Sequence, residues 1–291
     1  MTDPHTPSQG RHNLAVSADG DRDRVRLCLG DAREVLAAMP ATSVDCVVTS
    51  PPYWGLRDYR VNGQHGAEPT IEQYVDRLAD VFDEVRRVLT PTGTAWLNLG
   101  DSFGGSWGNY VARGSVARTA SARSAQAYGV HRPPQSRYRA KDLIGVPWRV
   151  AFALQNRGWV LRNAVVWAKT NGRPESVRDR LSQRYESVFL LARDGEHWFR
   201  DVDAEGVESD VWTVAADRGR TGHRAVGTVE VARRCVRLGC PDGGVVLDPF
   251  SGSGTTGIAA LAQGCSFIGI DLDPECHALA RRRLDTLVEA S

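Results

Sequence analysis

The sequence predicts an α/β fold in which a doubly wound, mainly parallel sheet carries helices on both faces. Apolar, β-branched runs of strand length alternate with helical patterns along most of the chain. In residues 70–89 apolar side chains recur every three or four positions, as in an amphipathic helix that packs on a sheet. Residues 244–288 repeat the alternation as strand, glycine-rich loop, helix, strand and helix.

The elements follow a polar N-terminal tail, residues 1–22, which we expect to be disordered. The expected strands are VRLCLG (25–30), SVDCVVTS (43–50), the end of PTGTAWLNLGD (91–101) after a turn at PTG, WVLRNAVVWAK (159–169), YESVFLLAR (185–193), GVVLD (244–248) and SFIGID (266–271), with HWFRD (197–201) and VWTV (211–214) as short candidates. Helices are expected at 31–39, where Asp31 and Glu34 form a capping box, and at 70–89, 144–158, 228–238, 255–264 and from Pro274 onward. We expect residues 23–291 to be one domain, interrupted by a basic loop at 102–140 and a mixed, charged segment at about 172–225.

The composition is that of an ordinary globular protein and limits the possible functions. The formal net charge is +1, so a surface for a polyanion would have to be local. The six cysteines form no CxxC pair and have no metal-ligand spacing, so we expect free, reduced thiols and no metal. No apolar run approaches the roughly 18 residues of a membrane span. We therefore expect a soluble, cytoplasmic protein with no membrane partner.

The stretch DPFSGSGTT at 248–256 predicts a nucleotide-type binding site. A buried strand ends at Asp248, and Gly252 and Gly254 let the backbone approach a ligand before a helix begins. Asp271 ends the next strand, where a carboxylate can bind ribose hydroxyls. The acidic strand end suits a cation. S-adenosylmethionine, with its ammonium and sulfonium groups, fits such a site; the alternative is a tight turn that binds nothing.

The stretch TSPPY at 49–53 ends a buried strand with two prolines and then exposes Tyr53. Alone, it is equally a strand terminator followed by a core tyrosine. Taken with DPFSGSGTT and FIGIDLDPE (267–275), in that order, it resembles the β-group of DNA amino-methyltransferases, whose chains are circularly permuted. The resemblance extends from about residue 24 to about residue 289 and includes LGDAREVL, TAWLNLGDS, GVPWRVAFALQNRGWVLRNAVVWAK and RYESVFLLAR.

The resemblance implies a Rossmann-like methyltransferase domain that uses S-adenosylmethionine, acts on double-stranded DNA and often forms a homodimer. It also implies a catalytic tetrapeptide and a cofactor site. The tetrapeptide is Ser50, Pro51, Pro52 and Tyr53, and the cofactor-binding residues are Asp31, Asp248, Pro249, Phe250, Gly252, Gly254, Thr255, Thr256 and Asp271. The role of Asp31 as a helix cap is an equally good explanation of that residue. Gly227 departs from the family pattern, which often has a proline there.

The tetrapeptide suits transfer of a methyl group to an exocyclic amine. The lone pair of such an amine is delocalised into the base, and two acceptors aimed at its hydrogens would localise it as the new bond forms. The Ser50 hydroxyl and the Pro51 carbonyl can be those acceptors, while Tyr53 stacks on a base flipped out of the duplex. The methyl group then passes directly and in line, without a covalent nucleophile.

The first residue of the tetrapeptide bears on the choice of base. Within the family, serine at this position is typical of enzymes that methylate N4 of cytosine, so we expect a site-specific N4-cytosine DNA methyltransferase of restriction–modification or orphan type. The alternatives are an N6-adenine DNA methyltransferase, a protein or RNA amine methyltransferase, and an inactive DNA-binding module. The order of the motifs argues against the protein and RNA enzymes, and the intact motifs argue against the inactive module.

Arginines are the candidate DNA contacts. The segment 102–140 has no acidic residue, and its arginines suit phosphate binding, although an insertion with no specific role is the alternative. The candidates are Arg113, Arg118, Arg123, Arg132, Arg137 and Arg139, together with Arg57, which follows the tetrapeptide. Residues 172–225 are expected to complete target recognition.

Overall fold

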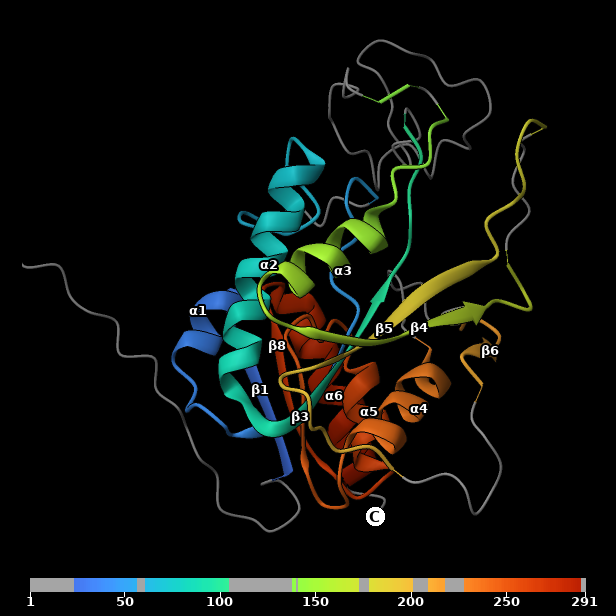
Figure 1. Cartoon of the computed structure of the whole chain (residues 1–291). Coiled ribbons are helices and arrows are strands. Elements are labelled where there is room, and N and C mark those ends of the chain that lie inside the picture. The colour runs from blue at the N-terminus through green and yellow to red at the C-terminus, as the bar shows by residue number, and fades with distance from the viewer. Residues whose placement is uncertain are drawn as a thin grey trace, which may run out of the picture.

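The computed structural model describes residues 24–56, 61–104, 138–139, 141–172, 178–200, 209–217 and 228–288. Within these residues eight strands form one sheet in the order β1-β8-β7-β2-β3-β5-β4-β6 (Figure 1). The strands are β1 (Val25–Leu29), β2 (Val44–Thr49), β3 (Leu89–Leu99), β4 (Val160–Ala168), β5 (Tyr185–Ala192), β6 (Val211–Thr213), β7 (Val245–Asp248) and β8 (Ser266–Asp271). The helices are α1 (Ala32–Ala37), α2 (Ile71–Val88), α3 (Val146–Asn156), α4 (Val229–Gly239), α5 (Thr255–Leu261) and α6 (Pro274–Val288).

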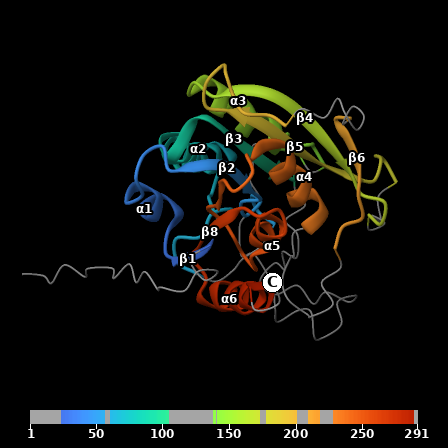
Figure 2. The ribbon, with the colours of Figure 1, turned by 90° about the horizontal axis from the view of Figure 1, so that it is seen from below.

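The sheet is mainly parallel and has helices on both faces, which confirms the fold class expected from the sequence. Among the described strands, only the two pairings of β5, with β3 and with β4, are antiparallel. Side chains of α1, α2 and α3 belong to one buried cluster, and those of α4, α5 and α6 belong to a second. Figure 2 shows these two groups of helices on opposite sides of the sheet.

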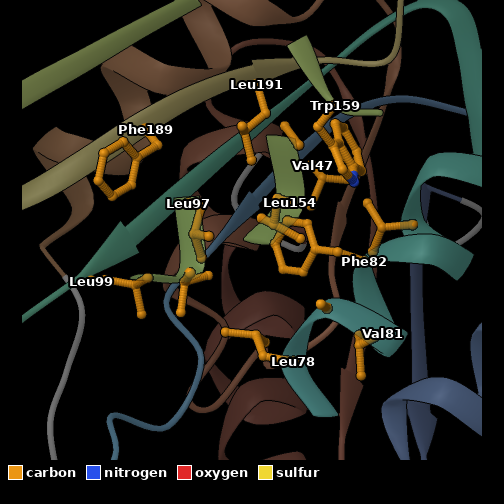
Figure 3. Packing of buried hydrophobic residues seen from close by; sticks show 14 of the residues in the cluster. Val47, Leu78, Val81, Phe82, Leu97, Leu99, Leu154, Trp159, Phe189 and Leu191 are labelled. Atoms are coloured by element: carbon orange, nitrogen blue, oxygen red, sulfur yellow. The ribbon is translucent and has the colours of Figure 1, made fainter. Parts of the chain in front are cut away.

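Alternation along the strands assigns side chains to the two clusters. On β2, Val47 belongs to the cluster with α1–α3, whereas its neighbours Cys46 and Val48 belong to the cluster with α4–α6. In the first cluster Phe82 of α2 meets Trp159 edge to face, with ring centroids 5.9 Å apart (Figure 3). The central strands are therefore buried on both faces, as their near-continuous apolar sequences predict.

Helix α2 confirms the amphipathic pattern of residues 70–89. Thr70 is its N-cap, and the hydroxyl oxygen accepts a hydrogen bond from the Gln73 backbone N–H at 3.2 Å. The basic Arg86 and Arg87 lie in the last turn, where they suit the helix dipole. The buried face comprises Ile71, Tyr74, Val75, Leu78, Ala79, Val81, Phe82, Val85 and Val88.

The turn expected at PTG is a bulge inside β3. Val44 of β2 pairs with Leu89, but Cys46, only two residues further on, pairs with Thr94. The additional residues of β3 are accommodated between these two pairs. The strand therefore begins before the glycine and proline that indicate a turn, and its register is restored at Thr94.

The sequence also predicts a short strand at HWFRD, and this prediction is wrong for the residues that can be checked. His197–Arg200 form no strand. Single backbone hydrogen bonds hold this segment instead, from Trp198 N–H to the Thr92 carbonyl at 2.8 Å and from Arg200 N–H to the Leu238 carbonyl at 3.0 Å. The contacts come from two different elements, so no ladder forms. The other expected strands and helices are present within three residues of their expected bounds.

Parts of the expected domain organisation fall outside the described residues. These parts are the tail, most of the basic loop 102–140 and much of the segment 172–225, and their organisation stays a prediction. In the portion of the chain that the structure describes, no helix combines the length and apolar character needed to span a membrane.

Candidate active site

The two sequence motifs meet at the carboxyl edge of the sheet because β2 and β7 are parallel neighbours. Val47 pairs with Leu247, so the last residues of the two strands lie side by side. There the Thr49 hydroxyl donates a hydrogen bond to Asp248 Oδ1 at 2.7 Å. The TSPPY loop and the DPFSGSG loop consequently leave the sheet together, at the edge where ligands bind in open α/β folds.

A cleft of about 1300 Å³ opens above this point. Of the residues predicted for catalysis and cofactor binding, it is lined by Asp31, Ser50, Pro51, Pro52, Tyr53, Asp248, Pro249, Phe250, Gly252, Thr255, Thr256 and Asp271. Gly254 is not part of the lining and is the N-cap residue of α5. The structure thus brings nearly the whole predicted set to one cavity.

Asp248 lies at the bottom of the cleft with both carboxylate oxygens engaged. Its Oδ1 accepts from the Thr49 hydroxyl and, at 3.0 Å, from the Phe250 backbone N–H. Its Oδ2 accepts from the Thr256 hydroxyl at 2.7 Å. The side chain is nearly fully buried, and this burial raises the pKa of Asp248 to about 6, with a smaller contribution from the nearby charge of Asp271. Asp248 therefore joins β2, β7 and α5 in addition to its predicted role toward the cofactor.

Asp271 shapes the glycine loop from the next strand. Its Oδ2 accepts from the Gly252 backbone N–H at 2.7 Å, and its Oδ1 accepts from the Asp273 N–H at 2.8 Å. Burial raises the pKa of this carboxyl as well. Gly254 has φ +78°, and a Cβ there would lie 3.2 Å from Ala280 Cβ of α6. A glycine is thus required by backbone conformation and by packing.

Asp31 caps a helix and also lines the cleft. Its Oδ1 accepts from the backbone N–H of Arg33 at 2.9 Å and of Glu34 at 3.3 Å, which confirms the N-cap of α1. The same residue is part of the cleft wall, and its Oδ2 is 4.0 Å from a guanidinium nitrogen of Arg77. The neighbouring Gly30 N–H bonds to the Asp271 carbonyl at 2.9 Å, which places the cap beside the end of β8.

A polar network around the TSPPY loop was not predicted. The Tyr53 hydroxyl donates to Glu186 Oε2 at 2.6 Å, and Asn98 Nδ2 lies 3.2 Å from Ser50 Oγ. Lys169 forms an ion pair with Glu186. Asn98, Lys169 and Glu186 lie in or directly after strands at the same edge of the sheet. The sequence feature that they share is a polar residue at the cleft end of an apolar strand, which a solvated strand end has as well.

His65 is a second residue that sequence reasoning missed. It lines the cleft, is 5% exposed and packs edge to face on Phe250, with ring centroids 5.1 Å apart. Burial, and then the charge of Arg77, lower the pKa of His65 to about 4, so the imidazole is neutral near pH 7. The next residue, Gly66, accepts a hydrogen bond from the Gly55 N–H at 2.9 Å. The segment with His65 and Gly66 therefore supports the TSPPY loop from outside the sheet. No pattern in the sequence predicts this contact.

The predicted DNA contacts are mostly outside the described residues, and only Arg139 is placed, as an exposed side chain. The two ends of the basic loop are nevertheless joined. Phe103 forms a bridge with Leu143, and the Arg180 guanidinium lies 3.6 Å from the centroid of the Phe103 ring. Lys141 also pairs with Asp179 at 2.5 Å. The two ends of the basic loop therefore lie next to residues 179–180, which precede β5.

Two of the six cysteines, Cys235 and Cys276, lie in the wall of the cleft. All six are free, and four of them are buried. Among the described residues no group of three or more histidine, cysteine, aspartate or glutamate side chains has the arrangement of a metal site.

Comparison with known proteins identifies the family. Residues 44–282 match the N6/N4 methyltransferase family, described as DNA methylase. The chain belongs to this DNA methylase family. The matched residues contain both the TSPPY and the DPFSGSG loops, so the resemblance expected from the motifs is confirmed.

Two type II methyltransferases are similar to this DNA methylase along most of their length. The type II methyltransferase M.SmaI of Serratia marcescens is 42% identical over 270 residues, which cover 89% of this chain and 90% of M.SmaI. M.Cfr9I of Citrobacter freundii is 40% identical, over 88% of this chain and 86% of its own. A putative DNA modification methylase of Thermus thermophilus, solved with S-adenosyl-L-methionine, is 26% identical, with a TM-score of 0.63 over 91% of this chain and 95% of that one. The cytosine-N4-specific PvuII methyltransferase shares the fold, with a TM-score of 0.67, 16% identity and 91% coverage of each chain.

Proposed function

We propose that this DNA methylase transfers a methyl group from S-adenosylmethionine to the exocyclic N4 of cytosine in double-stranded DNA. The observation that carries the proposal is the hydrogen bond between Thr49 and Asp248. It holds the serine-containing tetrapeptide beside the glycine loop in a single cleft. A base amine at Ser50 would therefore lie next to a methyl donor at the glycine loop.

The residues at the ends of β7 and β8 fit S-adenosylmethionine. The buried carboxylate of Asp248 and the half-buried carboxylate of Asp271 face one cleft, and the Thr255 hydroxyl is buried without a hydrogen-bond partner among the described residues. Buried acids of this kind suit ribose hydroxyls and a cationic ligand. We propose that Asp271 holds the ribose and that the loop with Pro249 and Phe250 surrounds the rest of the molecule. The bound cofactor supplies a methyl group on a sulfonium, and every other step depends on the protein.

The catalytic loop would act on the amine of the flipped base. The Ser50 hydroxyl and the Pro51 carbonyl accept its two hydrogens, so the nitrogen lone pair turns toward the methyl group. The rigid Pro51–Pro52 pair keeps the carbonyl in place, and Tyr53 stacks on the ring. Asn98 Nδ2 is 3.2 Å from Ser50 Oγ and fixes the orientation of that hydroxyl.

Cytosine is favoured over adenine by the identity of Ser50. Serine at the head of the tetrapeptide is typical of N4-cytosine enzymes, and the PvuII methyltransferase with the same fold is cytosine-N4-specific. Methylation of adenine N6 is the alternative, because a hydroxyl can accept from either amine. We further propose that the enzyme is the modification component of a restriction–modification system, or an orphan of that type, and acts on cellular DNA in the cytoplasm. We also propose that it forms a homodimer, which sedimentation would test.

Binding of the duplex is assigned to the two segments that start beside the cleft. We propose that Arg57 and the arginines of the basic loop 102–140 contact phosphates, and that residues 172–225 read the target sequence. Support comes from the joined ends of these segments, where Arg180 stacks on Phe103 and Lys141 pairs with Asp179. The duplex would then cross the cleft mouth over the catalytic loop.

The test is methyl transfer followed by analysis of the product. The purified protein is incubated with labelled S-adenosylmethionine and unmethylated plasmid DNA, and the DNA is digested to nucleosides for mass spectrometry. We expect N4-methylcytosine; N6-methyladenine would replace the cytosine assignment, and unlabelled DNA would overturn the function. The double variant Ser50→Ala, Tyr53→Ala is expected to lose transfer but keep cofactor binding. Ser43→Ala, at the opposite end of β2, is the matched control and should keep the wild-type rate.

A further inference from the structure

Four polar side chains meet at the wall of the cleft behind the tetrapeptide: Tyr53, Asn98, Lys169 and Glu186. Tyr53 comes from the loop after β2, Asn98 from β3, Lys169 directly after β4 and Glu186 from β5. They come together because β5 lies antiparallel between β3 and β4 (Figure 1), so that its first residues share an edge with the last residues of its neighbours. The side chains of Lys169 and Glu186 are only 22% and 14% exposed.

Both oxygens of the Glu186 carboxylate are engaged. Oε1 pairs with the Lys169 ammonium, and Oε2 accepts from the Tyr53 hydroxyl at 2.6 Å and from Asn98 Nδ2 at 2.9 Å. The Lys169 ammonium also lies 4.8 Å from the centroid of the Trp167 ring. A largely buried carboxylate needs such a set of donors to offset its desolvation. Glu186 is therefore fixed in position, and it fixes the groups that donate to it.

The network reaches the amine acceptor through Asn98. Its Nδ2 has two hydrogens and three acceptors within reach: Glu186 Oε2 at 2.9 Å, the Tyr53 hydroxyl oxygen at 3.0 Å and Ser50 Oγ at 3.2 Å. Since the Tyr53 hydroxyl gives its proton to Glu186, these two neighbouring oxygens can share one Asn98 hydrogen, and the other is available to Ser50. One carboxylate consequently orients the side chains of both functional residues of the tetrapeptide.

The aromatic ring of Tyr53 is restrained as well as its hydroxyl. A Cβ at Gly100 would lie 2.7 Å from Tyr53 Cε2 and 3.1 Å from Cδ2, so the ring packs against backbone that only glycine leaves accessible. Contact with Gly100 fixes one side of the ring, and the hydrogen bond to Glu186 fixes its far end. The ring plane is thus set without help from a bound base.

We propose that Glu186 is a positioning residue that sets the stacking ring of Tyr53 and, through Asn98, the hydroxyl of Ser50 before DNA enters the cleft. The proposal rests on the proposed function. Stacking on a base needs only the face of an aromatic ring, which phenylalanine also has, so stacking alone does not need a hydroxyl. In this chain the hydroxyl anchors the ring, and the anchored geometry lowers the reorganisation needed at the moment of transfer.

A double-mutant cycle with Tyr53→Phe and Glu186→Gln tests the proposal. The single-turnover rate of methyl transfer into unmethylated plasmid DNA is measured for wild type, both single variants and the double variant, alongside the Kd for S-adenosylmethionine and the Tm. Each single variant is expected to lose about tenfold or more in rate, because small displacements of reacting groups cost that much. The double variant should lose no more than the worse single variant, and the Kd for the cofactor should stay the same.

Each outcome separates a positioning role from other roles. Rate losses that multiply in the double variant would overturn the proposal, and so would a weakened cofactor Kd that accounts for the loss. Tyr74→Phe removes the same atom from a buried tyrosine of α2 outside the cleft and should keep the wild-type rate. If Glu186→Gln fails to fold, the rates of Tyr53→Phe and Tyr74→Phe still test the proposal. Equal rates of these two variants would overturn it. A wild-type protein that transfers no methyl group to DNA would overturn the proposed function instead.

Discussion

The Thr49 hydroxyl donates a 2.7 Å hydrogen bond to the Asp248 carboxylate and thereby ties the TSPPY loop to the DPFSGSG loop. Thr256 of α5 donates to the other oxygen of the same carboxylate, also at 2.7 Å. All three side chains are buried, so these hydrogen bonds are shielded from water. The relative position of the two loops depends on this small group of atoms.

Thr49→Val should loosen that group without changing the volume of the side chain. The variant leaves Asp248 Oδ1 with one donor fewer, and the free energy of unfolding should fall by about 1–3 kcal/mol. Urea denaturation followed by circular dichroism measures the change. Thr213→Val, at an exposed position of β6, is the control and should unfold like wild type. Equal stability of all three proteins would contradict a structural role for the hydrogen bond.

The stability of the cofactor-free protein should fall with rising pH because of Asp248. Burial raises its pKa to about 6, so the folded chain keeps a proton that the unfolded chain releases near pH 4. Between these values the folded state binds more protons, and stability decreases as the pH rises through the window. Asp248→Asn removes this titration, so its stability relative to wild type should grow by about 3 kcal/mol from about pH 4 to above pH 6. Urea denaturation at a series of pH values measures this difference. A constant difference in stability between wild type and Asp248→Asn across this pH range would contradict the raised pKa of Asp248.

Gly254→Ala should destabilise the fold more than Gly264→Ala does. Both Gly254 (φ +78°) and Gly264 (φ +77°) have left-handed backbone, but a Cβ meets Ala280 at 3.2 Å only in the first case. In each alanine variant the strained backbone lowers the free energy of unfolding by about 1 kcal/mol. Gly254→Ala should lower it further, because α6 must move to make room for the new Cβ. Thermal unfolding of the two variants compares them directly, and identical Tm values would rule out the steric contribution.

Asp271→Asn should weaken cofactor binding more than it weakens the fold. The carboxylate accepts from Gly252 and Asp273 with its two oxygens, and an amide can replace only one of these acceptors. We expect the Kd for S-adenosylmethionine to rise by about tenfold or more, which corresponds to a loss of roughly 1.4 kcal/mol or more of binding free energy. Calorimetric titration measures it. Asp285→Asn, exposed on α6, should bind like wild type, and an unchanged Kd for Asp271→Asn would remove this residue from the cofactor site.

Replacing the arginines of the basic loop should weaken DNA binding without affecting the cofactor. A variant with Arg113, Arg118, Arg123, Arg132 and Arg137 changed to glutamine can no longer neutralise the phosphates that we propose these side chains bind. The slope of log K against log salt concentration should then become shallower by about 0.9 for each phosphate that is no longer neutralised. Fluorescence anisotropy with a labelled duplex gives the slope. Arg26→Gln and Arg281→Gln, both at exposed positions away from the loop, should leave it unchanged, and a slope equal to wild type in the loop variant would refute these phosphate contacts.

The sequence was sufficient for the parts of the site that are local in the chain. Asp248, the GSG turn and Asp271 lie within one βαβ unit, whose spacing alone predicts a ligand at the strand ends. The amphipathic pattern of α2 and the cap at Asp31 are local in the same sense, and both are confirmed. The tetrapeptide was tied to the glycine loop only by family resemblance, because no local rule makes β2 and β7 neighbours.

The parts that could not be predicted depend on strand order. Asn98, Lys169 and Glu186 come together only because β5 is inserted antiparallel between β3 and β4. Nothing in the runs that carry them distinguishes a network residue from a solvated strand end. His65 lies in an irregular loop without period, and its burial follows from packing against Phe250, which no pattern encodes.

The contact between Thr49 and Asp248 joins residues that are 199 positions apart in the chain. During synthesis the catalytic loop leaves the ribosome long before the strand that completes its surroundings. Pairings of such long range form late in folding, after the local helices and hairpins. A chain that ends before β7 therefore has the tetrapeptide without the glycine-rich loop beside it, so the cleft is complete only after the last strands have been made.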